Sequence, residues 1–530
     1  MHTDDEAWKI RKVIVSTVIG GTFEWFDFMV YGYFSSTIAQ VFFASVNRGE
    51  SLLLTFATFA VGYLMRPIGG VVMGMYADRA GRVKALSWIM VAMSAGSLLL
   101  GLTPGFATLG LAAPILVVVG RLVQGFAVGA QFALSSVTIY EVAPPNQKMF
   151  YGSFNMMSLG IAAMLSSGCS FLLSRHLQQA EMAEWGWRVP FLIGALVGPI
   201  GFYIRHHVGE SEEFRRIQAR PAARAPVGKR MRDFVREDGD ALVCAIGVMM
   251  AGTSLHHVWH AYLPHYAQSQ LHLPLSSSLQ AVFVTSAISC VLSLVFGKLA
   301  DRVGPYRLFC FFIASWMTCV FPLFWYLLAA PTATRLMVVQ LVGMLFLTLQ
   351  GAAHPGMLVK IFTVQGRSTG VAISYNTAVM LFGGLAPFYI SVVARFADAQ
   401  VIPPSYLLGT SLAAIVLVLL TRTGRRVLKE DRPGREATPR PRTTTPVRQE
   451  QRLPANKRNF AREVSGAASR YRFCASSKAS GPGKFECVRS TTERSTCSHE
   501  QRPRNVDRVD LAGRARPTGK DRCRSTGSIS

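Results

Sequence analysis

Long apolar stretches recur along the first 421 residues of the chain and determine the environment in which it can fold. About 20 apolar residues are needed for a helix to span a bilayer. Polar and Gly/Pro-rich breaks separate twelve such stretches, namely Val13–Val41, Ser51–Tyr76, Ala85–Thr103, Leu111–Tyr140, Gly152–Leu173, Trp187–Ile204, Ala241–Ala267, Ser278–Ala300, Leu308–Leu328, Met337–Leu358, Thr369–Val393 and Ser405–Thr421. The pattern predicts an all-α membrane protein with twelve transmembrane helices in two six-helix bundles.

The basic residues of the short loops indicate how these helices are oriented. They gather on one side of the membrane, at Arg11, Lys12, Arg79, Arg82, Lys84, Lys148, the run 215–236, Arg302, Arg307 and Arg367. Loops rich in Lys and Arg face the cytoplasm. We therefore expect both termini to be cytoplasmic.

Charge and composition divide the chain into four parts. We predict an N-terminal bundle at 1–205, a cytoplasmic linker at 206–240, a C-terminal bundle at 241–422 and a basic tail at 423–530. The formal net charge is +25, and most of the excess lies after Thr421. Because the tail is rich in Arg, Thr, Ser, Pro and Gly, it buries too little apolar surface to offset its ordering entropy, and we expect it to be disordered.

A polar loop appears once in each half, between two apolar stretches. Residues 74–84 read G-x-x-x-D-R-x-G followed by basic residues, and residues 297–307 repeat the pattern. Such a repeat indicates a duplicated unit, and in transporters built from two halves the substrate site lies between them near mid-membrane. A polar turn that only sets topology is the alternative.

The residue types suggest how the loop works as a gate brace. The Asp can accept from the N-terminal backbone of the next helix, the glycines allow close approach and a tight turn, and the basic residues hold the loop at the cytoplasmic face. We expect Glu141 to pair with Arg79 or Arg82. The gating candidates are Gly74, Asp78, Arg79, Gly81, Arg82, Glu141, Asp301, Arg302 and Gly304.

This loop resembles the signature of the major facilitator superfamily. Further segments resemble its metabolite:proton symporter family, namely Gly21–Phe28 with Tyr31–Gly32, Arg66–Gly70, Arg121–Phe126, Trp185–Phe191, Ser374–Asn376, Phe382–Gly384 and Pro387. Members of that family carry citrate, dicarboxylates, oxoglutarate, shikimate or betaine-type osmolytes. The resemblance, strongest to citrate-type members, implies a bacterial inner-membrane symporter that moves protons with a small polar metabolite, such as citrate or a dicarboxylate. Gln131 and Lys360 depart from it, because family members usually carry acids near those positions.

Acidic residues inside the first apolar stretch are the main candidates for proton coupling. Glu24 and Asp27 lie one turn apart, and Tyr31 continues their face. Charged groups at membrane depth cost about 2.5 to 3.5 kcal/mol each, so they should face a cavity or a partner. We expect Arg121, with Gln124 beside it, to be the counter-charge of both acids or a clamp for a substrate carboxylate. A static ion pair between helices one and four is the alternative.

Polar residues in the second half could complete the site, which we expect helices one, four, seven, ten and eleven to line. His256, His257 and His260 on helix seven could relay protons or contact an anion, and Tyr375 and Asn376 could contact substrate. Hydrogen bonding between helices is the alternative for each. We expect Arg66 to extend to the cytoplasmic surface.

Other functional classes find little support. The chain carries no Walker-type loop, nucleophile elbow or H-E-x-x-H motif, so we expect neither an enzyme nor a cofactor. Its nine cysteines form no C-x-x-C pair, and no metal site is predicted. We expect a monomer in the lipid bilayer without a nucleic-acid partner. Two alternatives stay open, a proton-driven exporter and a membrane sensor or scaffold whose basic tail binds lipid.

Overall fold

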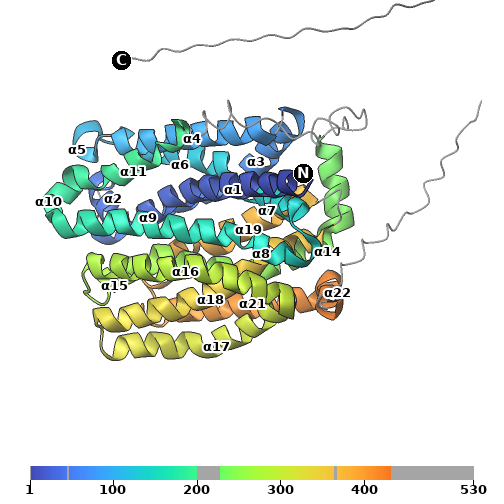
Figure 1. Ribbon diagram of the computed structural model, residues 1–530. Helices are drawn as coiled ribbons and strands as arrows, with labels where there is room; N and C mark the ends of the chain where they lie inside the picture. The colour runs from blue at the N-terminus through green and yellow to red at the C-terminus, as the bar shows by residue number, and fades with distance from the viewer. Residues whose placement is uncertain (1, 45–46, 81, 200–226, 363–366, 431–530) are drawn as a thin grey trace, which may run out of the picture. The chain divides into compact units, whose positions relative to one another are not determined.

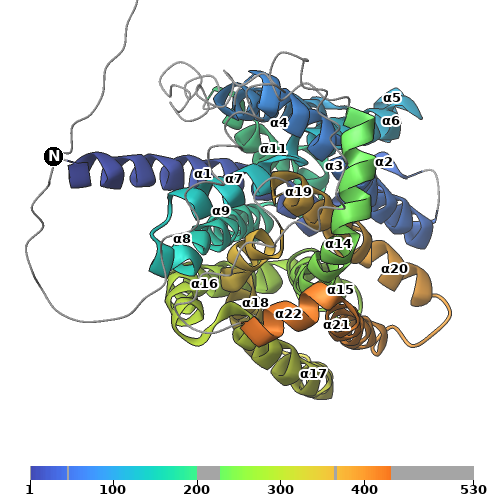
Figure 2. The same cartoon turned by 90° about the vertical axis from the view of Figure 1, so that its right-hand side faces the viewer.

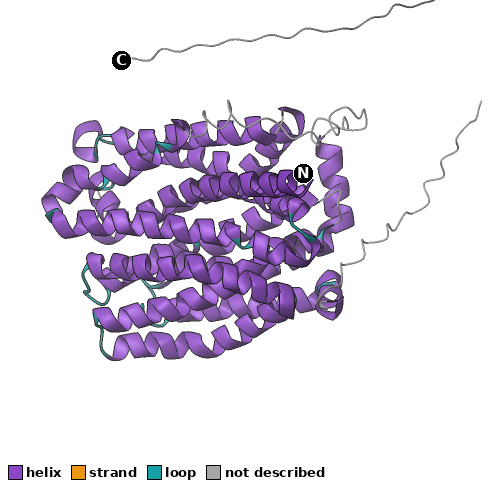
Figure 3. Ribbon diagram, in the orientation of Figure 1, coloured by secondary structure: helices purple, strands orange, loops and turns teal. Residues whose placement is uncertain are grey.

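The computed structural model describes residues 2–44, 47–80, 82–199, 227–362 and 367–430, which are helical almost throughout (Figure 3). Eleven helices in these ranges are long and apolar enough to cross a membrane. The sixth predicted span, Trp187–Ile204, begins as a helix, but its end lies outside the described residues. The described helices belong to one unit, residues 1–442.

The first half contains six predicted spans, several of them built from more than one helix. Its helices are α1 His2–Tyr33, α2 Ser35–Phe42, α3 Arg48–Ala80, α4 Arg82–Leu102, α5 Phe106–Leu109, α6 Ala112–Val128, α7 Gln131–Val142, η1 Pro145–Gln147, α8 Lys148–Gly152, α9 Phe154–His176, α10 Gln179–Glu181, η2 Met182–Gly186 and α11 Arg188–Gly194. The fourth span is thus α6 with α7, interrupted at Gly129 and Ala130.

The second half begins with a long helix that starts inside the predicted linker. Its helices are α14 Val227–His257, η4 Val258–Tyr262, α15 Leu263–Ser269, α16 Leu275–Val303, α17 Pro305–Ala329, α18 Ala333–Ile361, α19 Arg367–Ala378, η5 Val379–Gly384, α20 Ala386–Val393, α21 Ile402–Leu420 and α22 Arg422–Glu430. Helix α22 continues past the predicted bundle boundary, so the start of the predicted tail is helical; residues 431–530 lie outside the described part. Segments η4 and η5 are π-helical turns, a distortion frequent at functional sites.

Glycines set the spacing of the helices in the first half. A Cβ atom on Gly125 of α6 would overlap the backbone oxygen of Gly62 on α3, and one on Gly129 would overlap that of Arg66. The two backbones are therefore in direct contact, which the G-x-x-x-G spacing of Gly125 and Gly129 permits. This contact determines how α3 is rotated against α6.

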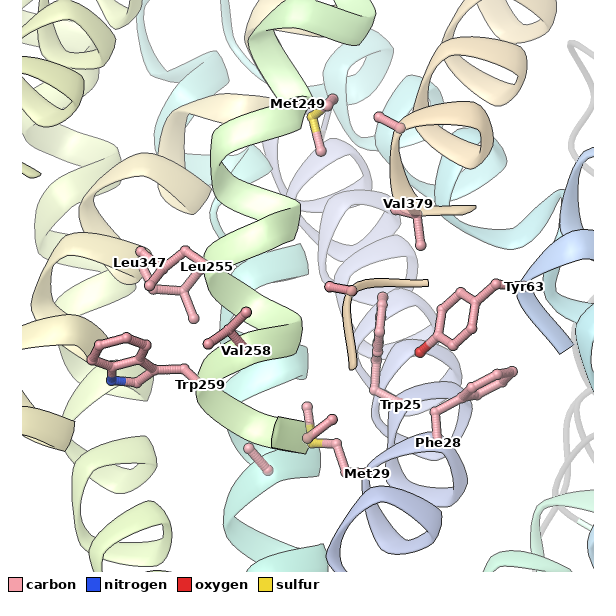
Figure 4. Close-up of a cluster of buried hydrophobic side chains, with 14 of the residues drawn as sticks. Trp25, Phe28, Met29, Tyr63, Met249, Leu255, Val258, Trp259, Leu347 and Val379 are labelled. Carbon is pink, nitrogen blue, oxygen red and sulfur yellow. The ribbon is translucent and has the colours of Figure 1, made fainter. Parts of the chain in front are cut away.

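The two halves meet where helix five packs on helix eight, and helix one also contacts the second half. Helix α9 of the first half packs on α16 of the second, and these two helices lie side by side in Figures 1 and 2. Helix α1 of the first half contacts η4 and α15 of the second. Large side chains fill the space on both sides of α14: Trp25, Phe28 and Tyr63 on one side, and Leu255, Val258 and Trp259 on the other (Figure 4).

Candidate transport site

A cavity of about 80 Å³ lies between the two halves, with room for several water molecules. Its walls come from α1, α7 and α9 of the first half and from α14, α18, α19 and η5 of the second. The polar side chains that line it are Glu24, Gln131, Ser135, Asn155, Ser158, Thr253, His256, His354 and Tyr375. Helices one, four, seven, ten and eleven all contribute, as expected, and helix five contributes as well. Small polar residues on helix five had no sequence signal that separated them from ordinary packing positions.

Glu24 faces this cavity and forms an ion pair with Arg66, whose side chain is fully buried. Glu24 Oε1 lies 3.8 Å from Arg66 Nη1, which is an electrostatic contact rather than a hydrogen bond. The guanidinium lies over the rings of Phe28 at 4.4 Å, Tyr63 at 4.5 Å and Trp25 at 5.0 Å. The expectation that Arg66 extends to the cytoplasmic surface was wrong. Aromatic rings from two helices hold its charge in the interior by cation–π contact instead.

Asp27 belongs to a separate polar network inside the first half. Ser97 Oγ donates to Asp27 Oδ2, and Gln124 Nε2 donates to the same oxygen at 3.2 Å. Arg121 Nη1 in turn donates to Gln124 Oε1 at 2.9 Å. Arg121 therefore acts on Asp27 through Gln124.

We expected Arg121 to be the counter-charge of both acids, but in the structure each acid lies near a different arginine. Glu24 pairs with Arg66, while Arg121 lies near Asp27 and over the rings of Tyr31 at 3.8 Å and Phe28 at 5.0 Å. Helical spacing could place the acids on one face of α1, but it could not show which arginine meets which acid. The result is two acid–arginine groups with the Phe28 ring in contact with both arginines.

The helix-seven histidines lie between the halves in different settings. His257 Nδ1 donates to Thr253 O at 2.8 Å, and His260 Nδ1 donates to His256 O at 3.1 Å, so both bond to their own helix rather than to a neighbour. His256 lines the cavity, with its ring 5.0 Å from that of Trp25. Among the described residues, nothing hydrogen-bonds to His256 Nδ1 or to Nε2 of His354 across the cavity.

The two candidates on helix eleven connect the halves. The Tyr375 ring stacks on Phe132 of α7 with 3.8 Å between ring centroids. Asn376 Nδ2 donates to the backbone oxygen of Gly129 at 2.6 Å. Tyr375 thus lines the cavity, whereas Asn376 forms the interhelical bond that was its alternative role.

A comparison with models of known protein families identifies the family of this chain. Residues 17–387 match the model of the Major Facilitator Superfamily. The chain belongs to this superfamily. The predicted twelve-helix fold in two bundles is thereby confirmed, and the protein is a transporter rather than an enzyme.

Curated relatives of this superfamily member include citrate-proton symporters and putative proline/betaine transporters. A citrate-proton symporter from Salmonella typhi is 32% identical over 417 residues, which cover 77% of this chain and 94% of the relative. A citrate-proton symporter from Klebsiella pneumoniae is 31% identical, covering 77% and 90%. A putative proline/betaine transporter from Staphylococcus aureus (strain COL) is 30% identical, covering 78% and 88%.

Solved structures agree on the fold. The xylose transporter XylE from E. coli, in a partially occluded inward open conformation, aligns with a TM-score of 0.61 and 17% identity over 78% of this chain and 99% of that one. The human organic anion transporter MFSD10 aligns with a TM-score of 0.53 and 13% identity, covering 77% and 99%.

The polar loop that occurs once in each half is the motif loop of this major facilitator chain. Its second copy, residues 297–307, connects the two halves at the end of the molecule where the basic loops lie. The Asp301 carboxylate accepts from the backbone N–H groups of Met149 and Phe150, each at 2.9 Å. These groups belong to α8 of the first half, not to the next helix of its own half as the sequence suggested. Gly304 has φ 103°, so it makes the turn into α17 with a backbone conformation that favours glycine. Arg302 is exposed.

The structure describes only part of the first motif loop, residues 74–84. Among the described residues, no atom beyond its chain neighbours and the backbone of its own helix lies within 4 Å of a Cβ atom placed on Gly74, so the expected close approach is absent there. The side chains of Asp78, Arg79 and Arg82, and the whole of Gly81, lie outside the described residues. Glu141 is exposed at the end of α7, and its expected pairing with those arginines stays a prediction.

Proposed function

We propose that the protein is a proton-coupled symporter that carries a small organic acid, such as citrate or a dicarboxylate, into the cytoplasm by alternating access. One observation carries the proposal: helix α1 lines the cavity between the halves and carries two buried acids, Glu24 and Asp27, each of which lies near a buried arginine. Buried acids that alternate between a cationic and an apolar setting can bind and release protons. The citrate-proton symporter relatives support the same reading.

The contacts suggest different roles for the two acids. Glu24 faces the cavity, so a proton or a substrate arriving there changes its pairing with Arg66 directly. Asp27 is fully buried, and its hydrogen-bonded connection to Arg121 runs through Gln124. We propose that Glu24 senses the cavity and that Asp27 holds the proton while the halves rearrange.

The cavity offers groups that suit carboxylates. His256 and His354 present ring nitrogens from opposite helices of the second half, and Gln131 and Asn155 present amides from the first. Each can donate a hydrogen bond to a carboxylate oxygen. We propose that an organic acid binds between these two walls, with Tyr375 beside it.

A betaine-type substrate is the second candidate, because the same cavity contains Trp25, Phe132 and Tyr375 together with Glu24. Aromatic rings and a carboxylate recognise quaternary ammonium groups. The proline/betaine relatives make this class worth testing beside the acids.

We propose the rest of the organisation as the sequence predicts it. Both termini lie in the cytoplasm, the membrane is the bacterial inner membrane, the two halves rock as bundles 1–205 and 241–422, and one chain suffices for transport. Truncation of the chain after Glu430 distinguishes this proposal from a sensor whose output lies in the tail. We expect the truncated chain to keep transport, whereas such a sensor would lose its function.

Uptake into proteoliposomes tests the proposal. Labelled citrate, oxoglutarate, succinate, shikimate and betaine are offered with an inward proton gradient, and the control collapses the gradient with an ionophore. We expect one acid to accumulate only while the gradient lasts. Accumulation of betaine alone would favour the second candidate. Proton-driven loss of preloaded solute would instead identify an exporter, and accumulation that the ionophore leaves unchanged would contradict coupling.

A further inference from the structure

The last transmembrane helix does not continue straight out of the membrane. Helix α21 ends at Leu420, and Thr421 adopts an extended conformation with φ −77° and ψ 143°. The chain then forms α22, which in Figures 1 and 2 lies across the end of the neighbouring helices rather than along α21. It lies at the end of the molecule where α8 and the start of α14 are found (Figure 1).

Specific contacts hold this turn. The Asp240 carboxylate on α14 accepts from the backbone N–H groups of Arg422 at 3.0 Å and Thr423 at 2.7 Å. Thr421 Oγ1 accepts from the N–H of Gly424 at 3.2 Å. Since capping side chains from two elements satisfy the first N–H groups of α22, its direction is determined by the fold.

The two faces of α22 differ in chemistry. Val427 is buried in the core and Leu428 packs against it. Arg422, Arg425 and Lys429 are all exposed, and their spacing of three and four residues places them on one face. We call these three residues the basic stripe of α22.

The stripe begins where the hydrocarbon region should end. Leu419 and Leu420, at the end of α21, are 51% and 70% exposed, as expected of side chains that face lipid. Arg422 follows two residues later, so the stripe lies at the depth of the headgroups. Basic residues on an amphipathic helix beside a membrane span attract anionic lipids, by about fivefold in affinity for each Lys or Arg.

We propose that the basic stripe of α22 is a docking face for the headgroups of anionic phospholipids. The occupant follows from charge and position: the stripe is cationic, it faces outward at headgroup depth, and its inner face is already packed on the bundle. The chain beyond Glu430 is itself basic and would be repelled. The stripe contains no aromatic side chain on which a nucleic-acid base could stack. This inference does not depend on the transported substrate.

Native mass spectrometry of the full chain tests the proposal. The detergent-solubilised protein is mixed with equal amounts of phosphatidylglycerol and phosphatidylcholine, and the bound lipids are counted. We compare the wild type with the triple variant R422Q/R425Q/K429Q and with a charge-conserving control, R422K/R425K/K429R. The tail is the same in all three, so it contributes equally.

We expect the wild type and the charge-conserving control to prefer phosphatidylglycerol and the Gln variant to lose at least tenfold of that preference. If the triple variant does not fold, Arg425→Gln alone should lose about fivefold. The proposal is overturned if the Gln variants keep the wild-type preference, or if the charge-conserving control loses it too. Tight binding of a short oligonucleotide through the stripe, without any lipid preference, would also overturn it.

Discussion

Two acids one turn apart on α1 occupy settings that differ in access and in partners. Glu24 lines the cavity and pairs with Arg66, and Asp27 is enclosed with Ser97 and Gln124. Because only one of them meets the cavity, we expect their substitutions to affect different steps of the transport cycle.

The first prediction concerns Asp27. Asp27→Asn keeps the shape of the side chain but removes the group that takes up a proton, so we expect gradient-driven accumulation to fall at least tenfold while exchange of labelled for unlabelled substrate continues. Both are measured in proteoliposomes, with Ser97→Ala as a control that keeps the carboxylate. If accumulation and exchange both survive Asp27→Asn, Asp27 is not a coupling residue.

The second prediction concerns the Glu24–Arg66 pair. Breaking a buried ion pair costs about 3 to 5 kcal/mol, because one charge stays uncompensated. We expect Glu24→Gln to lower the thermal midpoint of the purified protein strongly. The double variant Glu24→Gln with Arg66→Met should recover much of the loss, since it removes both charges and leaves an apolar chain among the rings. If the stability losses of the two single variants simply add in the double variant, the two side chains do not stabilise each other, and the prediction is wrong.

At the scale of elements, close helix contacts decide which side chains meet. Helices α3 and α6 touch through Gly62, Gly125 and Gly129. This contact directs Arg66 of α3 toward the rings of α1. A bulkier α6 would move α3 outward and with it the partner of Glu24.

The third prediction tests this contact by stability. In Gly125→Ala the added methyl group would overlap the backbone oxygen of Gly62, which cannot move without shifting the helix. We expect a loss of at least about 1 to 3 kcal/mol, typical of overpacking, seen as a lower thermal midpoint in detergent. Gly74→Ala is the matched control on α3, because its Cβ would have no neighbour within 4 Å. Equal stability of the two variants would contradict the close contact.

At the scale of the whole molecule, the halves are joined at several levels. Asp301 bonds to α8, Asn376 bonds to Gly129, and on the far side of the cavity Ser36 Oγ lies 3.3 Å from His265 Nδ1. In the transport cycle that we propose, release of substrate to the cytoplasm must break the contacts on the Asp301 side. The second motif loop therefore acts as a latch in this cycle.

The fourth prediction concerns this latch. Hydrogen bonds to a charged group contribute about 1.5 to 3 kcal/mol each, so Asp301→Ala should raise the inward-open population about tenfold or more. The readout is labelling of a Ser135→Cys reporter in the cavity with an impermeant maleimide, added to inside-out vesicles. The parent chain without the reporter corrects for native cysteines, and Arg302→Gln serves as the neighbouring control. An unchanged labelling rate in Asp301→Ala would exclude the latch.

Much of the architecture could be predicted from the sequence, because the constraints behind it are local. An apolar stretch of sufficient length must span the membrane whatever its neighbours are, and a repeated loop indicates a repeated half. Acids placed inside such a stretch need a partner, so Glu24 and Asp27 could be singled out before any fold was known. Those statements depend only on residue type and spacing.

Which arginine meets which acid was decided by the tertiary structure alone. Arg66 and Arg121 both lie within apolar helices, and each could have reached α1. Rotation of α3 and α6 about their axes, which their glycine contacts determine, places Arg66 beside Glu24 and Arg121 beside Gln124. The sequence by itself determined that this is a membrane carrier with buried acids; the packing of its helices decided their partners, because rotation about a helix axis depends on contacts between residues far apart in the chain.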